Sequence, residues 1–123
     1  MKLTETIQSA DWKKEKHAPV IECPDEVKAG EVFEVQVSVG KDIPHPNTIE
    51  HHISWITLYF QPEGSKFPYQ VGHFEFSGHG AGSVFTSPSA SVALKVDQPG
   101  TLQAMSFCNL HGLWESSKDI NAG

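Results

Sequence analysis

The sequence predicts an antiparallel β-sandwich, and three observations lead to this fold class. Long runs with the apolar period of a helix are missing from the chain. Several short segments instead alternate apolar and polar residues or are continuously apolar, which is typical of strands. Turns rich in glycine and proline separate these segments at short intervals, as in all-β domains. With 123 residues, of which 38% are hydrophobic and 20% charged, we expect a single globular domain over residues 1–123.

The first two predicted strands carry the strongest patterns. Glu31–Val39 alternates cleanly, and its apolar positions form one face of a half-buried strand. Ile53–Phe60 is apolar on both faces, so we expect it to be covered on one side by the second sheet and on the other by another subunit. The apolar positions of the first strand are Phe33, Val35, Val37 and Val39.

The remaining elements follow from weaker signals. The first twenty residues lack a strand pattern until about Val20, so we expect an irregular N-terminal arm with a helical turn near Thr4–Ala10. Further strands are predicted at Tyr69–Phe76, Ser91–Val96 and Thr101–Cys108, with a short one at Val84–Thr86.

Composition excludes several classes of partner. Nine basic against fifteen acidic residues give a net charge of −6, which argues against a nucleic-acid partner. No apolar run is long enough for a membrane span, and the start "MKLTETIQSADW" has no apolar core of a signal peptide. We therefore expect a cytoplasmic protein in which the two cysteines, Cys23 and Cys108, stay reduced.

Histidines are concentrated in the segment "IPHPNTIEHHI". His45 lies between Pro44 and Pro46, whose restricted backbone angles stiffen the loop and hold the imidazole in place. His51 follows at the entrance to a strand. Its neighbour His52 points to the opposite face of an extended chain, so only one of the two can serve the same ion. Such a rigid histidine-rich loop indicates a metal site.

Two further segments add donors of the same kind. "CNLHGLW" places Cys108 and His111 at the end of a strand, and "EKHAPVI" contributes His17. A Cys-x-x-His pair or a single histidine is a weak signal alone, but together the segments offer four nitrogens and one sulfur. This donor set suits a redox metal better than magnesium or calcium, which prefer oxygen. Five protein ligands on iron would leave one octahedral position open for a small molecule.

These three motifs, in this order, resemble the iron centre of the superoxide reductases of the one-iron neelaredoxin type, in the desulfoferrodoxin family. The resemblance runs along nearly the whole chain and includes "GHFEFSGHG". It implies an immunoglobulin-like sandwich of about seven strands. It also implies one iron ion (Fe²⁺/Fe³⁺) with four equatorial imidazoles and an axial thiolate, from His17, His45, His51, His111 and Cys108.

The resemblance assigns roles to two more residues. Glu15 matches the glutamate that fills the sixth iron position in the oxidised resting state, and Lys16 matches the lysine beside that position. The implied reaction is the one-electron reduction of superoxide to hydrogen peroxide, with a rubredoxin-like protein as electron donor and a homotetramer as the assembly. The four-cysteine site of two-domain members has no counterpart here, and the stretch from His79 to Pro88 is shorter than expected.

Two other classes of protein share some of these features. A cupredoxin-like electron carrier uses a β-sandwich with histidine and cysteine ligands, but it needs a methionine downstream, and only Met1 and Met105 are present. A binding module with a structural zinc would have a closed, four-coordinate site. Dismutation of superoxide is a related activity that sequence does not separate from reduction. We expect His52, His73 and His79 to be structural.

Overall fold

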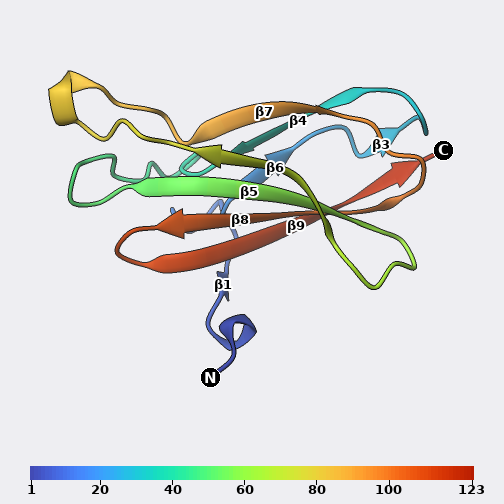
Figure 1. Ribbon diagram of the computed structural model, residues 1–123, viewed down its shortest axis with the longest axis horizontal. Coiled ribbons are helices and arrows are strands. Elements are labelled where there is room, and N and C mark those ends of the chain that lie inside the picture. The colour runs from blue at the N-terminus through green and yellow to red at the C-terminus, as the bar shows by residue number, and fades with distance from the viewer.

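Two β-sheets face each other in the computed structural model, which describes residues 1–123 (Figure 1). The larger sheet has the order β1-β9-β8-β5-β6, with β3 also paired to β9, and the smaller has the order β2-β4-β7. Nine strands form, and two of them have only two residues, which leaves the expected number of about seven. The predicted antiparallel β-sandwich is confirmed. Its strands are β1 (Gln8–Ser9), β2 (Val20–Glu22), β3 (Glu26–Val27), β4 (Phe33–Ser38), β5 (Ile53–Pro62), β6 (Tyr69–Glu75), β7 (Ser89–Leu94), β8 (Gly100–Cys108) and β9 (Gly112–Ala122).

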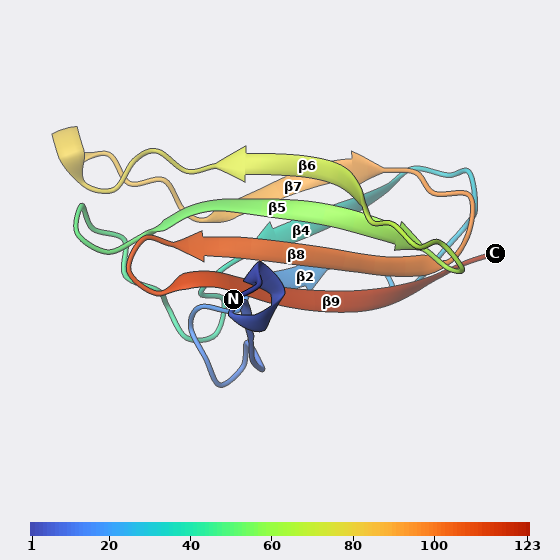
Figure 2. The same cartoon turned by 60° about the horizontal axis from the view of Figure 1, so that its bottom comes forward.

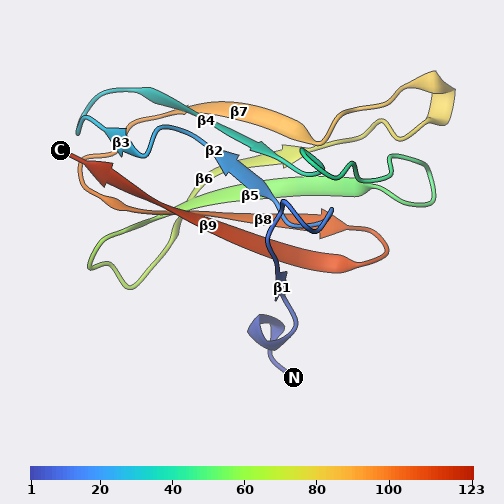
Figure 3. The same ribbon diagram turned by 180° about the vertical axis from the view of Figure 1, so that it is seen from behind.

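The hydrophobic core lies between the two sheets. β4 contributes Val35 and Val37, and β5 contributes Ile56 and Leu58, all at most 1% exposed. The polar side chains that alternate with the valines of β4 are exposed or half-buried, as the period of two requires. Figure 3 shows the smaller sheet from the side opposite to Figure 1.

The outer face of β5 is only partly covered within this chain. Trp55 and Tyr59 are half-buried, and Trp55 stacks on Phe107 with ring centroids 5.7 Å apart. A groove lined in part by Trp12, Tyr59 and Met105 lies on this outer face. Cover by another subunit therefore stays a prediction.

The longest strand, β9, was not predicted from sequence. Its middle reads Glu115 to Asp119, a run with no apolar residue and little strand propensity. Only Trp114 and Ile120 are buried, at 8% and 2% exposure. Pairing along the whole of β8, from Gly100 to Cys108, determines this strand because it satisfies the backbone hydrogen bonds.

Two smaller expectations need correction. The N-terminal arm begins with a 3-10 helix, η1 (Leu3–Glu5), which lies beside the label N in Figure 2. Residues 8–9 then form β1 (labelled in Figure 3) and pair with β9 in parallel, instead of extending a helical turn. Val84–Thr86 is not a strand, since only an isolated bridge joins Phe85 to His79, beside the second 3-10 helix η2 (Ala81–Ser83).

Several connections meet at one end of the sandwich (Figure 1). They are the segment between β4 and β5, the connection between β6 and β7, and the β8–β9 turn, while the C-terminus lies at the other end. No helix in the structure has the length and apolar character needed to cross a membrane.

Candidate metal centre

Cys108 ends β8 at the point where three strands are in register. It is paired with Gly112 at the start of β9 and with Ile53 at the start of β5, and it is 0% exposed. Gly112 has φ +79°, which lets the chain reverse within the tight turn between the two strands. The pairing with Ile53 also brings His51, two residues upstream, close to the sulfur.

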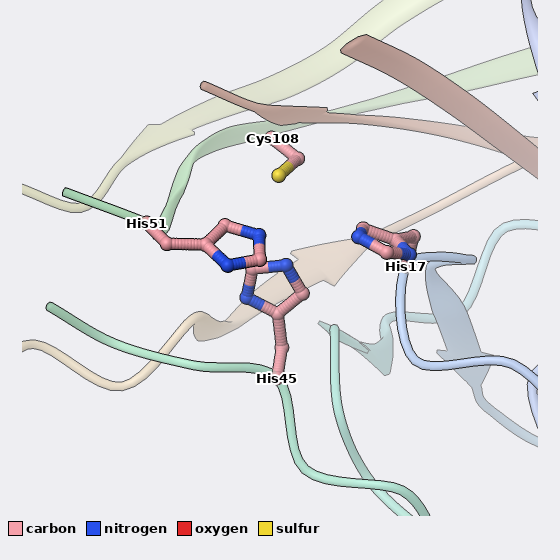
Figure 4. A group of neighbouring side chains, drawn as sticks. All are labelled: His17, His45, His51 and Cys108. Carbon is pink, nitrogen blue, oxygen red and sulfur yellow. The ribbon is translucent and has the colours of Figure 1, made fainter. Parts of the chain in front are cut away.

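Five predicted side chains converge at this point. The donor atoms of His17, His45, His51 and Cys108 all lie within 4.8 Å of one another (Figure 4). His111 completes the group, because its Nδ1 lies 3.1 Å from Nε2 of His17 and 3.7 Å from Sγ of Cys108. The structure brings these residues together from three distant parts of the chain, and their assignment as ligands stays a prediction.

The donor atoms fit a metal ion. Nε2 of His45 and Nε2 of His51 are buried and have no hydrogen-bond partner, at a cost of about 1–3 kcal/mol each when left unpaired. Nδ1 of His45 donates to the carbonyl oxygen of Pro46 at 2.7 Å, so Nε2 is the unprotonated nitrogen that faces the cluster. Imidazole nitrogens with one sulfur are the donors that transition metals prefer. A bound ion would satisfy the unpaired nitrogens.

His17 is held from three sides. Its ring stacks on Trp114 at 4.9 Å between centroids and 13° between planes, and its carbonyl accepts a hydrogen bond from the buried hydroxyl of Ser106 at 3.1 Å. Its Nδ1 donates to Glu15 at 2.6 Å, which leaves Nε2 free to face His111. The indole nitrogen of Trp114 donates to the carbonyl of His111 at 3.2 Å and so links both histidines.

Glu15 lies on the outer side of His17 in this structure. Its carboxylate accepts hydrogen bonds from the backbone N–H groups of His17 and Ala18 and from the His17 ring. Burial alone would raise the pKa of Glu15, but the hydrogen bonds from His17 outweigh it and hold the pKa below its ordinary value. The carboxylate is not among the converging donor atoms, so its place at an iron stays a prediction.

Glycine at position 40 gives the backbone of His45 the space it needs. Gly40 has φ +91°, and a Cβ atom there would lie 2.8 Å from the backbone nitrogen of His45. A side chain would therefore add left-handed strain and also displace the ligand loop, defined here as residues 43–52.

Asn109 is a site residue that sequence reasoning missed. Its Oδ1 accepts from the N–H of His52 at 2.8 Å, and its Nδ2 donates to the carbonyl of Glu50 at 2.9 Å. The amide thus ties the ligand loop to the turn that carries Cys108 and His111. The available signal was its place directly after Cys108, but nothing in the sequence shows which backbone groups it would meet.

Lys16 supplies positive charge near the cluster without an ion pair of its own. The pKa of His45 falls from 6.5 to about 4, mainly because of burial and further because of the charges of His17, His51 and Lys16, against the Pro46 hydrogen bond that raises it. Burial likewise lowers the pKa of His51, with His111, His17 and Lys16 adding to the effect. Both imidazoles are therefore neutral near neutral pH, as metal binding requires.

The other histidines and Cys23 lie outside the cluster. His52 stacks on His79 with centroids 3.6 Å apart, and Nδ1 of His73 lies 2.6 Å from the hydroxyl of Thr57. Cys23 is a free thiol whose pKa is raised by burial.

The fold and the cluster together define a β-sandwich with a mixed histidine–cysteine site for a metal ion. The chain belongs to the desulfoferrodoxin family, since the model of the family described as desulfoferrodoxin matches residues 9–117. Neelaredoxin of Megalodesulfovibrio gigas is 55% identical over 127 residues, covering 98% of each chain. Superoxide reductase of Pyrococcus furiosus is 54% identical and covers 93% of this chain and 95% of its own. The family resemblance predicted from the three motifs is confirmed.

Solved structures agree with this membership. The structure of superoxide reductase (neelaredoxin) from Archaeoglobus fulgidus in the reduced form superposes with a TM-score of 0.86 at 54% identity. The match covers 94% of this chain and 98% of that chain, so the likeness includes the sandwich and the segments at its end.

Gly40→Ala should weaken metal binding through His45. We expect the substitution to lower the free energy of unfolding by roughly 2 kcal/mol through backbone strain, and to reduce metal affinity because His45 moves. Urea unfolding of the metal-free protein and metal titration measure the two effects. Gly64→Ala is the control, because Gly64 has φ +80° and a Cβ atom added there would meet nothing within 4 Å, so it adds strain alone. Equal metal affinity in both variants would contradict the role of Gly40.

The metal-free protein should lose stability in mild acid. In the folded state the pKa of His45 is about 4, against 6.5 ordinarily, so between these values the unfolded chain binds a proton that the folded chain does not. The free energy of unfolding should therefore fall as pH falls from about 6.5 to about 4, and His51 acts in the same direction. Urea midpoints across this interval measure the slope. His45→Gln should flatten it, and a wild-type profile that is already flat would count against the pKa shift.

Proposed function

We propose that this protein is a superoxide reductase, which reduces superoxide by one electron to hydrogen peroxide at a mononuclear iron. The observation that carries the proposal is the convergence of four imidazole nitrogens with the buried sulfur of Cys108. Relatives more than 50% identical over nearly the whole chain carry the name superoxide reductase, which supports it. The proposed ligands are His17, His45, His51, His111 and Cys108. Residues 1–123 would act as one domain, since both halves supply ligands.

The donor set supports a transition metal, and the family resemblance implies that this metal is iron. Nitrogens with a thiolate favour a redox-active ion over hard cations, and five protein donors leave the sixth position of an octahedron free. When bound, the iron supplies the electron for superoxide by passing between its ferrous and ferric states. The chain itself holds the imidazoles neutral, buries the thiol and covers one face of His17 with Trp114.

The alternatives fit the geometry less well. A structural zinc uses four ligands in a closed site, whereas here His111 lies as a fifth candidate donor beside the group of His17, His45, His51 and Cys108. A cupredoxin-like site needs an axial methionine near its histidine and cysteine, but Met105 lines the groove on the outer face of the sheet. The visible spectrum of the loaded protein, together with metal analysis, separates these cases, because ferric-thiolate and copper-thiolate bands differ and a zinc site has none.

Lys16 is the proposed group that attracts the substrate and helps to protonate the product. Superoxide is an anion and the chain carries a net charge of −6, so attraction has to come from the local field. The charge of Lys16 contributes to the lowered pKa of both His45 and His51, which supports this role. Two protons and one electron convert superoxide to hydrogen peroxide, and the ammonium group of Lys16, or water held by it, supplies a proton.

Glu15 is our candidate for the ligand of the sixth position in the oxidised state. In this structure its carboxylate accepts three hydrogen bonds from His17 and Ala18. Occupying the sixth position would require the carboxylate to leave these donors, so Glu15 would exchange one set of partners for another between oxidation states.

The electron donor, assembly and location complete the proposal. We propose a rubredoxin-like donor, a homotetramer and the cytoplasm. The partly covered outer face of β5 supports assembly, and the two free cysteines suit a reducing compartment.

Stopped-flow mixing tests the activity directly. Iron-loaded, reduced protein is mixed with superoxide, and we expect one hydrogen peroxide for each iron oxidised, without release of oxygen. Oxygen release in step with peroxide would instead indicate dismutation. Cys108→Ser should remove the ferric-thiolate absorption and most of the activity, and a variant that keeps both would overturn the ligand assignment.

Lys16→Ala should slow the capture of superoxide while leaving iron bound. We expect the bimolecular rate constant to fall by about three- to tenfold and its dependence on salt to weaken, because one local positive charge is lost. Lys95→Ala is the control. Lys95 directly follows β7, whose last residue pairs with Phe33 at the start of β4, and so it lies away from the ligand loop. An unchanged rate in Lys16→Ala would remove this residue from the mechanism.

A further inference from the structure

The connection between β6 and β7 forms a small hairpin at residues 78–86. The N–H of Thr86 donates to the carbonyl of Gly78, and the N–H of Gly80 donates to that of Val84, both at 2.7 Å. His79 and Phe85 form a bridge between these two hydrogen bonds. The hairpin projects from the same end of the sandwich as the ligand loop (Figure 1).

Asn47 joins the ligand loop to both sides of this hairpin. Its Nδ2 donates to the carbonyl of Thr86 at 3.0 Å, so its Oδ1 is the acceptor and Nδ1 of His79 donates to it at 2.8 Å. One side-chain amide therefore bridges the base of the hairpin, two residues after His45. Both of its polar atoms are used in this bridge.

His52 makes the second contact between the ligand loop and the hairpin. Its ring lies flat against that of His79, with centroids 3.6 Å apart and 5° between the planes. Its Nδ1 donates to the carbonyl of Thr48 at 2.8 Å, which holds the ring in the stacking position. The stack is directly next to His51 in the chain, and neither imidazole belongs to the converging donors.

We propose that hairpin 78–86 is a clamp on the ligand loop, in which His79 and Asn47 are positioning residues for the metal ligands His45 and His51. The ligand loop contains no strand, and besides the backbone hydrogen bond from the N–H of Asn109 to the carbonyl of His52, side-chain contacts restrict its position. Asn109 holds the loop on the side of the β8–β9 turn, and His79 holds it on the side of the hairpin. Both contacts of Asn47 lie at the base of the hairpin, at His79 and Thr86.

The clamp should act on metal retention. A loop with fewer restraints samples more positions in which His45 or His51 is away from the ion, which speeds dissociation. Loss of a hydrogen-bonded partner next to a ligand typically costs 10- to 100-fold in affinity. His79 does not contact a proposed ligand directly but acts through Asn47 and His52. We therefore expect a smaller effect in His79→Ala, about a three- to tenfold faster release of the metal. This inference rests on the proposed function only in requiring that the cluster binds a metal.

The experiment compares metal release to a chelator from matched variants of the full-length protein. His79→Phe keeps the aromatic stack and loses the hydrogen bond to Asn47, so its release rate should lie between those of wild type and His79→Ala. Asn47→Ala should also release metal faster than wild type. It tests the same contact if His79→Ala does not fold. His73→Ala is the control, because His73 bonds to Thr57 on the sheet and does not touch the ligand loop.

Thermal unfolding of the metal-free variants separates positioning from general stabilisation. The clamp predicts faster release with a metal-free unfolding temperature close to that of wild type. Release rates equal to wild type in both His79→Ala and Asn47→Ala would overturn it, and so would a loss of metal-free stability large enough to explain the faster release.

Release is measured for iron and separately for Co²⁺. Wild-type protein that retains Co²⁺ but no iron would refute the proposed function, while the comparison of variants with Co²⁺ still decides on the clamp.

Discussion

Two buried imidazole nitrogens without a hydrogen-bond partner are the constraint on which the rest of this structure depends. A folded protein rarely leaves such atoms unpaired, because each has lost its water without a replacement. Here Nε2 of His45 and Nε2 of His51 face a sulfur and the nitrogens of two more histidines. The simplest compensation is a cation at their common point. The surrounding structure holds the nitrogens there in spite of the cost of burying them.

The sandwich provides the rigid part of this arrangement, and the segments around it provide the rest. Cys108 is fixed by strand pairing on both sides, from β5 and from β9. The histidines come from irregular segments. Ser106 of β8 holds the segment of His17, while Asn109 and Asn47 tie the ligand loop to the β8–β9 turn and to hairpin 78–86. A redox site needs ligands that move little between oxidation states, and a strand end surrounded by anchored loops meets this need.

Sequence patterns predicted the features that depend on local chemistry. The alternation in β4, the continuously apolar β5 and the three histidine and cysteine motifs can all be recognised in short windows of sequence. β9 could not be, since "ESSKD" has no strand pattern and forms a strand only through its pairing with β8. The contacts of Glu15 with His17, and those of Asn109 with the ligand loop, were equally hidden. Short polar side chains find partners that depend on how distant segments are placed, and spacing in the sequence carries no information about this.

The N-terminal arm has a consequence for when the protein can take up its ion. His17 lies outside the main antiparallel ladders, and His111, whose Nδ1 is 3.1 Å from Nε2 of His17, is 94 positions further along the chain. A nascent polypeptide therefore cannot assemble this cluster until residue 111 has left the ribosome, because His17 and His111 must meet. Metal uptake at this cluster thus has to wait for both segments, and a bound ion would join two parts of the chain that are 94 positions apart.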